Sequence, residues 1–197
     1  MDKKIFRQEC LRKLEGTLGS RRFIKNHRLM EKIDFFIKKY NPRSILFYLP
    51  MGHEPDIRPL IRKWRTKVNV YVPFMEGKSF KLVQYRLPLY RKRYGIYEPN
   101  NSHFYKREID MAVVPVVGVD RRLGRVGFGK GMYDRFFGSL DRRPLILFVQ
   151  LEKCYTRDVV TDDYDVVADI YLTPEETITR GKKYVDRVDH RRCGRYR

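Results

Sequence analysis

Hydrophobic and polar positions follow two different rhythms along the chain. In residues 2–18 and 23–39 the apolar side chains recur every three or four positions, which predicts two amphipathic helices. Short, nearly unbroken apolar runs instead indicate strands that are buried on both faces of a sheet. Such runs occur at residues 44–49, 111–119, 144–150 and 166–172.

Weaker signals fill the spaces between these runs. We expect strands at residues 67–72 and 80–85 around a turn at 74–78, and helices that end near residue 65 and span 132–140. Strands that alternate with helices and read as continuous apolar runs favour an α/β fold with three layers. In such a fold a mostly parallel sheet is covered by helices on both faces.

The length of 197 residues suits one domain with a proper hydrophobic core. We assign residues 1–180 to this domain and residues 181–197 to a basic C-terminal tail. A solvated tail is the favoured interpretation, and loose electrostatic contact with nucleic acid is the alternative. The sequence has no apolar run long enough for a membrane span, and its start, Met-Asp-Lys-Lys, lacks the apolar region of a signal peptide.

The formal net charge of +19 predicts a positive surface potential and attraction to polyanions such as nucleotides, RNA or anionic lipids. Lys and Arg are spread along the chain, so we expect much of this charge on solvated surface. Cys10, Cys154 and Cys193 are odd in number and share no metal-ligand spacing. This pattern favours free thiols in a reducing cytoplasm.

A glycine-rich loop follows the apolar run at 111–119 and precedes the predicted helix at 132–140. It contains Gly124, Gly127, Gly129 and Gly131. A strand, a glycine loop and a helix can bring several backbone N–H groups to bear on one phosphate group. Arg125 and Lys130 add cationic groups to the same loop, so the pattern favours phosphate binding.

The loop does not match the established nucleotide motifs in full. It has the glycine and lysine spacing of a P-loop, but Gly131 stands where a P-loop has the Ser or Thr that holds magnesium. It also lacks the spacing of the dinucleotide fingerprint. Asp134 is a possible substitute ligand for magnesium. The alternative is a plain loop in which Asp134 only complements the helix dipole.

Two cations of the first predicted helix also suggest an anion. Lys3 and Arg7 fall on the same stripe as Phe6 and Cys10, at its N-terminal end. Cations four residues apart repel slightly, so directing both inward suggests that an anion binds there. The alternative is a fraying terminus that leaves both side chains in water.

Acidic residues provide further candidates. Glu54 and Asp56 follow the first predicted strand, where ligands of open α/β sheets collect. Asp56 could simply cap the next helix, so Glu54 is the better functional candidate. A second acidic group, mostly interpreted as turn and capping residues, could complete a metal site with Asp134. Its members are Asp158, Asp162, Asp163, Asp165 and Asp169.

Together these landmarks resemble the 5-formyltetrahydrofolate cyclo-ligase family, also called 5,10-methenyltetrahydrofolate synthetase, over residues 3–176. The most specific motif is R-V-G-F-G-K-G-M-Y-D at residues 125–134, which is similar to the family's R-L-G-x-G-x-G-Y-Y-D. The supporting matches are Lys3 with Arg7, Glu54 with Asp56, Y-G-I-Y-E-P at 94–99, and Gln150 with Asp165 and Asp169. The departures are Val126 for leucine, Met132 for tyrosine and Tyr164 for histidine.

The resemblance implies a fold related to ribose-5-phosphate isomerase and the CoA transferases. It also implies ATP- and Mg²⁺-dependent conversion of 5-formyltetrahydrofolate to 5,10-methenyltetrahydrofolate in the cytoplasm, with release of ADP and phosphate. The formyl oxygen would be phosphorylated, and N10 would then attack the activated carbon.

The resemblance assigns roles to individual residues. The ATP site would comprise Lys3, Arg7, Arg125, Gly127, Gly129, Lys130 and Gly131. The catalytic residues would be Arg125, Lys130 and Tyr133. The folate site would comprise Leu49, Met51, Glu54 and Tyr133. Magnesium would be held by Asp134 and Asp165.

Two other functions stay open at this point. The charge and the tail fit a nucleic-acid-binding protein, although no RNA-reading motif with interleaved aromatic residues is present. A phosphosugar or acyl-CoA enzyme fits the anion-binding loop, but it gives no reason for the carboxylates of Asp134 and Asp165. We expect small-molecule substrates, no membrane contact, and a monomer or weak homodimer.

Overall fold

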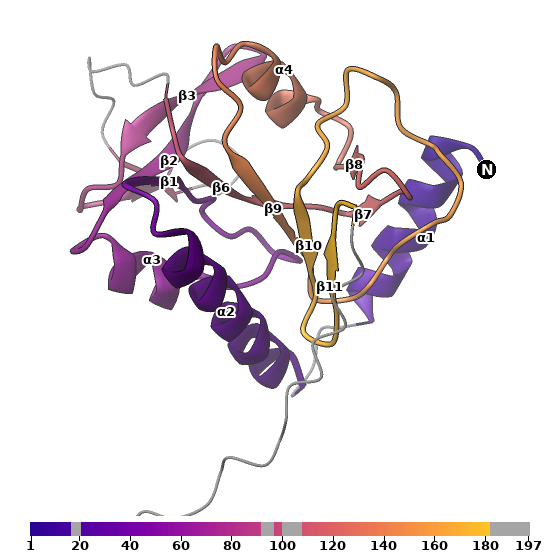
Figure 1. Cartoon of the computed structure of the whole chain (residues 1–197), viewed down its shortest axis with the longest axis horizontal. Helices are drawn as coiled ribbons and strands as arrows, with labels where there is room; N and C mark the ends of the chain where they lie inside the picture. Colours follow the sequence, from indigo (N-terminus) through magenta and orange to yellow (C-terminus); the bar gives the residue numbers. More distant parts are fainter. Residues whose placement is uncertain (17–20, 92–96, 100–107, 182–197) are drawn as a thin grey trace, which may run out of the picture.

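The computed structural model describes residues 1–16, 21–91, 97–99 and 108–181 (Figure 1). Its helices are α1 (Lys3–Glu15), α2 (Arg21–Tyr40), α3 (Arg58–Trp64) and α4 (Met132–Gly138). The main sheet contains β1 (Ser44–Leu46), β2 (Asn69–Glu76), β3 (Ser79–Gln84), β6 (Met111–Pro115), β9 (Leu145–Val149), β10 (Ile170–Leu172) and β11 (Thr177–Thr179). Two small pairs are formed by β4 (Tyr90–Arg91) with β5 (Tyr97–Glu98), and by β7 (Gly118–Val119) with β8 (Arg125–Val126).

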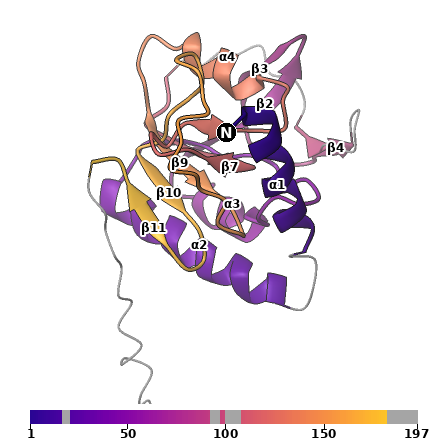
Figure 2. The same cartoon turned by 90° about the vertical axis from the view of Figure 1, so that its right-hand side faces the viewer.

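The seven-stranded sheet has the order β11-β10-β9-β6-β1-β2-β3. Its five central strands are parallel, and β11 and β3 add an antiparallel strand at each edge. Helices α2 and α3 cover one face, and α4 lies on the other (Figures 1 and 2). The prediction of a three-layer α/β fold with a mostly parallel sheet is therefore confirmed.

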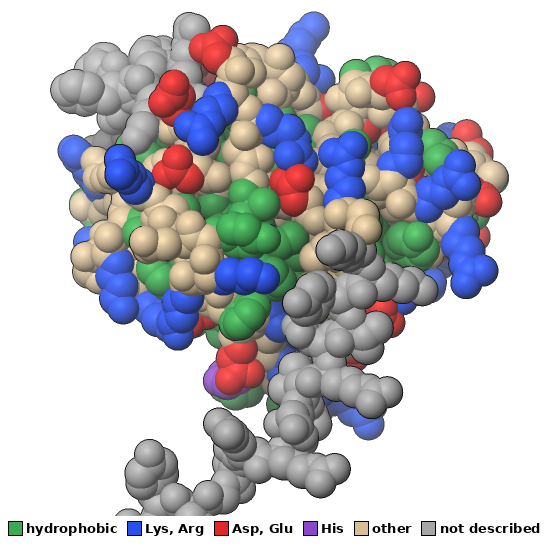
Figure 3. All heavy atoms as spheres, in the orientation of Figure 1, with side chains coloured by type: hydrophobic (Ala, Val, Ile, Leu, Met, Phe, Trp, Pro, Cys, Tyr) green, Lys and Arg blue, Asp and Glu red, His purple; other side chains and the backbone are tan. Residues whose placement is uncertain are grey.

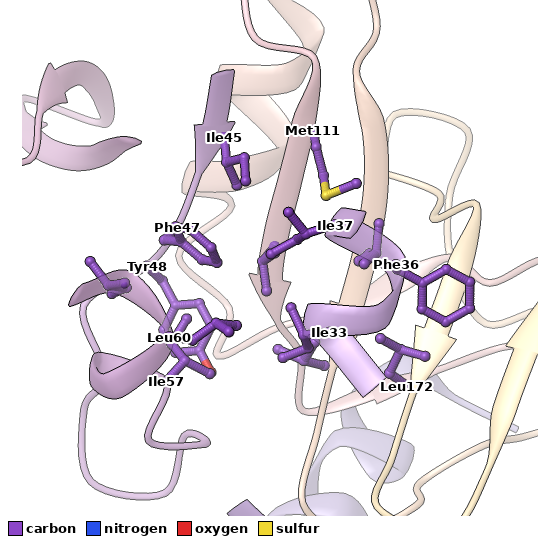
Figure 4. Packing of buried hydrophobic residues seen from close by; sticks show 14 of the residues in the cluster. Ile33, Phe36, Ile37, Ile45, Phe47, Tyr48, Ile57, Leu60, Met111 and Leu172 are labelled. Atoms are coloured by element: carbon purple, nitrogen blue, oxygen red, sulfur yellow. The ribbon is translucent and has the colours of Figure 1, made fainter. Parts of the chain in front are cut away.

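Alternating side chains of the central strands supply the cores on the two faces. Val113 and Leu147 pack toward α2 and α3, whereas their neighbours Val114 and Phe148 belong to the cluster under α4. The close view of the first cluster shows Ile33 and Ile37 of α2 directed at the sheet residues (Figure 4). Both faces of β1, β6, β9 and β10 are buried, which is why the sequence shows continuous apolar runs there instead of alternation.

Several predicted strands are longer than the observed ones. The run at 111–119 is divided because the chain leaves the sheet after Pro115: Val117 donates its N–H to Val126 of β8 instead of to a sheet neighbour. The run at 166–172 begins as a connection, and only Ile170–Leu172 joins the sheet. The first strand likewise ends at Leu46, while the helix predicted at 132–140 ends at Gly138.

Helix α1 lies beside β7 and β8 at one end of the sheet, apart from α2 (Figures 1 and 2). Asp2 caps it, since its carboxylate accepts hydrogen bonds from the N–H groups of Lys4 and Ile5. Phe6, Cys10 and Leu14 form its buried stripe. The predicted end of this helix, at residues 17 and 18, lies outside the described residues, as do residues 94–96 and the tail from 182 onward.

A disulfide bond joins Cys10 of α1 to Cys154, which follows β9. The prediction of free thiols is therefore wrong for these two cysteines, and Cys193 lies outside the described residues. The two partners are 144 positions apart in the sequence, so no local spacing could reveal them. The tertiary fold brings them together when α1 packs across the segment after β9, with Val117 and Val126 beside them.

Candidate active site

A polar cleft of about 750 Å³ lies between α1, the glycine loop and the segment at 162–165. Its walls include Lys3, Arg7, Arg125, Gly127, Gly129, Gly131, Asp134, Arg135 and Asp165. Segments that are far apart in the sequence thus meet at one place. Of the residues predicted for ATP and magnesium, only Lys130 is not a wall residue in the described structure.

Two glycines of the loop are needed for steric reasons. A Cβ at position 127 would lie 2.2 Å from Nη1 of Arg125, so glycine leaves the room that this guanidinium occupies. Gly131 has φ of +60°, a left-handed conformation that side chains other than glycine rarely adopt. The loop conformation and the position of Arg125 therefore depend on each other.

Arg125 of β8 is the most deeply buried cation of the cleft, with 7% exposure. Its Nη2 donates to the carbonyl of Pro115 at 3.1 Å, and its nearest carboxylate, Asp134, is 3.9 Å away. Its Nε has no hydrogen-bond partner among the described residues. Burial lowers the pKa of Arg125, although Asp134, Tyr133 and Glu54 oppose the shift. This guanidinium is therefore only partly compensated.

Lys3 and Arg7 lie one turn apart on α1 and both face the cleft, as their stripe predicted. Lys3 pairs with Asp165 and, at 3.2 Å, with Asp162. Burial would lower the pKa of Lys3, but these two carboxylates outweigh it and the pKa is raised. Arg7 donates from Nε to the carbonyl of Gly127 at 2.8 Å, so α1 is tied directly to the glycine loop.

Asp134 and Asp165 both line the cleft. Asp134, in the first turn of α4, accepts a hydrogen bond from the N–H of Val166 at 3.1 Å. Asp165 accepts from the N–H of Asp162 at 2.7 Å and pairs with Lys3. No group of three or more His, Cys, Asp or Glu side chains in the described ranges could hold a metal by itself. A magnesium ion with one or two protein carboxylates fits this pair, because magnesium usually completes its shell with water and substrate phosphates.

Arg135 is a residue of the cleft that the sequence analysis missed. It donates from Nε to the carbonyl of Lys78 at 2.7 Å and from Nη2 to the carbonyl of Lys130. Its position four residues after Gly131, on the next turn of the helix, is the signal that could have identified it. Lys130 itself is exposed.

A second, smaller cavity of about 110 Å³ lies on the other side of Tyr133. It is lined by Tyr48, Leu49, Met51, Glu54, Pro73, Met75, Phe80, Met132 and Tyr133. All four residues predicted for the folate site are on this list. The guanidinium of Arg125 lies 4.7 Å from the centroid of the Tyr133 ring. Arg125 and Tyr133 therefore stand between the polar cleft and the apolar cavity.

Glu54 is the buried acid of this cavity, with 7% exposure. Burial raises its pKa to about 7 from an ordinary value of 4.5, although the N–H of Met51 and the charge of Arg125 oppose the shift. Burial also raises the pKa of Tyr133, so the Tyr133 hydroxyl stays protonated at neutral pH. The cavity thus offers an acid that titrates near neutrality and a hydroxyl group, in otherwise apolar surroundings.

Arg22 of α2 holds the segment that carries Glu54. Its Nη2 donates to the carbonyls of Gly52 and Glu54. Asp56, by contrast, pairs with Arg58 at 2.6 Å and accepts its N–H at the start of α3. The interpretation of Asp56 as a local helix-start residue agrees with these contacts, and nothing in the periodicity of α2 singled out Arg22.

The remaining acids of the C-terminal cluster have local partners. Asp158 pairs with the N-terminal amine, Asp163 with Arg122 and Asp169 with Arg143. Asp158 and Asp169 line neither the polar cleft nor the apolar cavity in the described structure. Asp162, Asp163 and Asp165 line the polar cleft, so the interpretation of most of this cluster as turn and capping residues stays a prediction.

The three departures from the family motif have identifiable surroundings. Val126 is buried under α1, and Met132 lines the apolar cavity. Tyr164 is exposed at the rim of the polar cleft, where the ammonium of Lys3 lies 5.6 Å from its ring centroid. None of them replaces a cation or a carboxylate of the cleft.

Comparison with known proteins connects this geometry to a family. The 5-formyltetrahydrofolate cyclo-ligase family matches residues 1–174. The 5-formyltetrahydrofolate cyclo-ligase of Mycoplasma pneumoniae is 25% identical over 178 residues, which are 89% of this chain and 100% of the relative. The enzyme of the same name from Haemophilus influenzae is 26% identical over 140 residues, which are 66% of this chain and 75% of the relative.

Solved structures show the same fold. The 5,10-methenyltetrahydrofolate synthetase of Aquifex aeolicus superposes with a TM-score of 0.79 at 23% identity, covering 97% of this chain and 100% of that chain. The synthetase of Mycoplasma pneumoniae gives 0.69 at 21% identity, covering 89% and 100%. Because the family match extends over most of the sequence, the chain belongs to the 5-formyltetrahydrofolate cyclo-ligase family of enzymes.

Proposed function

We propose that this protein is an ATP-dependent cyclo-ligase that converts 5-formyltetrahydrofolate to 5,10-methenyltetrahydrofolate. The polar cleft binds the phosphates of ATP, and the apolar cavity behind Tyr133 receives the pterin end of the folate. Family membership supports the activity. The arrangement of the two pockets supports the assignment of each substrate to its place.

The buried guanidinium of Arg125 is the observation that carries this proposal. A buried cation is costly unless an anion compensates it, and here the nearest carboxylate is 3.9 Å away while Nε has no partner among the described residues. A phosphate oxygen in the cleft would supply the missing negative charge. Since Arg125 also packs on Tyr133, the bound phosphate would face the folate.

The chemistry needs an activated oxygen, because a formamide oxygen is a poor leaving group. The γ-phosphoryl group of ATP passes to the formyl oxygen and ADP departs. N10 then attacks the formyl carbon and gives up its proton to the departing phosphate or to water, the carbon–oxygen bond breaks, and phosphate leaves with the activated oxygen. Catalysis of such a transfer is mainly positioning and charge neutralisation. Arg125, Lys3 and Arg7 provide that charge along one wall of the cleft.

Other residues take supporting roles in the proposal. The backbone of Gly127, Gly129 and Gly131 lets the phosphates approach closely, and Lys130 at the loop surface could reach them from solvent. Asp134 and Asp165 hold Mg²⁺ when ATP is bound, and the ion supplies further neutralisation of phosphate charge. In the structure the ammonium of Lys3 pairs with the carboxylate of Asp165. When Mg²⁺ binds that carboxylate, Lys3 is released from the pair and can turn to the phosphates.

The folate end requires some adjustment of the protein. A cavity of about 110 Å³ is small for a bicyclic pterin. Three methionines line it, Met51, Met75 and Met132, and methionine side chains repack readily around a ligand. Glu54 accepts hydrogen bonds from the amino and ring N–H groups of the pterin, which are donors. This explains why an acid is buried in an apolar cavity.

An absorbance assay tests the function. Purified protein is mixed with 5-formyltetrahydrofolate, ATP and Mg²⁺, and the near-ultraviolet absorbance of the methenyl product is followed. We expect product only when all three components are present. Protein that turns over the folate without ATP, or that gives no product at all, would contradict the proposal.

Two substitutions test the proposed roles in the same assay. Asp134→Asn and Arg125→Lys are expected to lower kcat/KM by about 100-fold or more, as removal of charge-stabilising groups commonly does. Asp141→Asn is the matched control, because Asp141 is exposed just beyond α4 and lines neither pocket in the described structure. Circular dichroism confirms that each variant is folded.

A further inference from the structure

Arg135 connects the two pockets. Its Nη2 donates to the carbonyl of Lys130, between Gly129 and Gly131 of the glycine loop. Its Nε donates to the carbonyl of Lys78, in the turn between β2 and β3. One guanidinium therefore bonds to the backbone of the phosphate loop and to the backbone of a hairpin on the opposite side of α4.

The hairpin of β2 and β3 is part of the apolar cavity. Pro73 and Met75 of β2 and Phe80 of β3 are three of its wall residues. Phe80 also stacks on Phe136 of α4, with ring centroids 4.4 Å apart, and meets Tyr133 edge-on at 5.1 Å. A ligand that displaces these side chains moves the hairpin relative to α4, and Lys78 moves with the hairpin.

The backbone of the glycine loop is also in close contact with Arg135. A Cβ at Gly131 would lie 2.9 Å from Nη1 of Arg135, so the guanidinium lies close against the left-handed residue of the loop. The carbonyl of Lys130 is fixed by the same side chain. A shift of Arg135 is therefore passed to the peptide groups that line the phosphate cleft.

We infer that Arg135 is a positioning residue that couples the binding of the folate to the binding of the nucleotide phosphates. The inference rests on the proposed function for the identity of the two ligands. Pterin binding against the hairpin fixes Lys78, and through Arg135 it sets the glycine loop in the form that holds phosphate. Each ligand then raises the affinity for the other by the same factor, because coupling free energies are reciprocal.

Isothermal titration with a non-hydrolysable ATP analogue and Mg²⁺ measures this coupling. The analogue is titrated into the protein alone and into protein saturated with 5-formyltetrahydrofolate, and the reciprocal pair of titrations is run. In the wild type we expect about fivefold or greater tightening in both directions. In Arg135→Gln we expect the coupling factor to fall to about one, because the side chain no longer joins the carbonyls of Lys78 and Lys130. Each ligand alone should still bind.

Two further variants separate the link from simple charge and from unfolding. Arg135→Lys keeps the charge but cannot bridge two carbonyls in the planar manner of a guanidinium, so it is expected to lack the coupling as well. Arg142→Gln removes another exposed arginine just after α4 that lines neither pocket in the described structure, and it should keep the wild-type factor. Unfolding midpoints are measured for all variants.

The outcomes are distinct. Three results would overturn the inference: no coupling between the two ligands in the wild type, the wild-type coupling factor in Arg135→Gln, or restoration of that factor by Arg135→Lys. An equal loss of affinity for both ligands with an unchanged factor also overturns it, because Arg135 would then be an ordinary contact. Failure of the proposed function is seen separately, since the wild type would then not bind the folate when the folate is titrated into the protein alone.

Discussion

At the scale of single residues, Glu54 is a buried acid whose charged form lowers the stability of the folded protein. Glu54 is 7% exposed, and burial raises the pKa of its carboxyl to about 7. A carboxyl whose pKa is higher in the folded state than in the unfolded state binds its proton more tightly when folded. The contribution of Glu54 to the stability of the folded state is therefore fully present below pH 4.5, and it is lost as the pH rises through about 7.

Glu54→Gln should remove this pH dependence. A pKa rise from 4.5 to about 7 corresponds to about 3 kcal/mol of unfolding free energy at most. We expect the unfolding free energy of the variant to equal that of the wild type at pH 5 and to be higher at pH 8. Urea denaturation at both pH values measures it. Glu175→Gln, which changes an exposed acid, is the control and should follow the wild type. A variant with no gain at pH 8 would show that Glu54 is not destabilising when charged.

The residues of the site differed in how far the sequence could identify them. Lys3 and Arg7 were found because a helix repeats every 3.6 residues, so the position of Phe6 and Cys10 determines the direction in which they point. Asp134 was found because it follows the glycines directly. Arg22 and Arg135 act on backbone carbonyls of distant segments. The spacing of Arg135 from Gly131 could have pointed to the cleft, but no local pattern reveals which distant carbonyl either arginine contacts.

At the scale of elements, α1 is the part of the cleft with the fewest connections to the sheet. Phe6, Cys10 and Leu14 bury it in a small cluster of their own, separate from the clusters on the two faces of the sheet. The polar contacts of Lys3 and Arg7 and the disulfide add to this packing. The disulfide is therefore a major support of an element that supplies two cations to the active site.

Reduction of the disulfide should weaken both the fold and the site. Removal of a native disulfide typically costs about 2–4 kcal/mol of unfolding free energy. We expect a lower denaturation midpoint in a phosphine reductant, faster hydrogen exchange confined to α1, and weaker binding of the ATP analogue. Cys193→Ser, which keeps the Cys10–Cys154 pair, is the control. Unchanged exchange and affinity after complete reduction would contradict this account.

The elements themselves were largely predictable, and their ends were less so. Strand β11 was not predicted. Helix α2 and the other strands of the main sheet were anticipated from the pattern of apolar residues, and burial on both faces leaves the continuous runs of β1, β6 and β9. The division of the run at 111–119 was not, since Gly118 and Val119 are as apolar as the strand before them. Gly118 pairs with Val126 and lies against Phe6 and Cys10 of α1, whereas Val119 pairs with Arg125 and packs in the cluster under α4. Composition cannot distinguish these two kinds of burial.

At the scale of the whole molecule, the charge is distributed instead of concentrated. In the face shown in Figure 3, Lys and Arg side chains are scattered and are interspersed with acids. The prediction that much of the net charge of +19 is solvated surface agrees with this view. None of the described helices is long and apolar enough to cross a membrane. Within the described residues, Lys3, Arg7 and the buried Arg125 bring positive charge together in the polar cleft.

Deletion of residues 182–197 tests the assignment of a separate tail. The sheet ends at Thr179, so we expect the shortened protein to keep the denaturation midpoint and the turnover of the full chain. Binding to RNA at low salt should weaken, because the deletion removes cations that release counterions on binding. Filter binding over a range of salt concentrations measures this effect. A loss of turnover would show instead that the tail belongs to the catalytic domain.

The burial of the disulfide has a consequence for its lifetime in a reducing cell. Cys10 is 0% and Cys154 is 1% exposed, so a dithiol cannot attack either sulfur until α1 lifts away from the segment beneath it. The rate of reduction is then limited by how often the helix opens. If the proposed function holds, nucleotide bound by Lys3 and Arg7 would keep α1 in place and would slow the reduction of the disulfide.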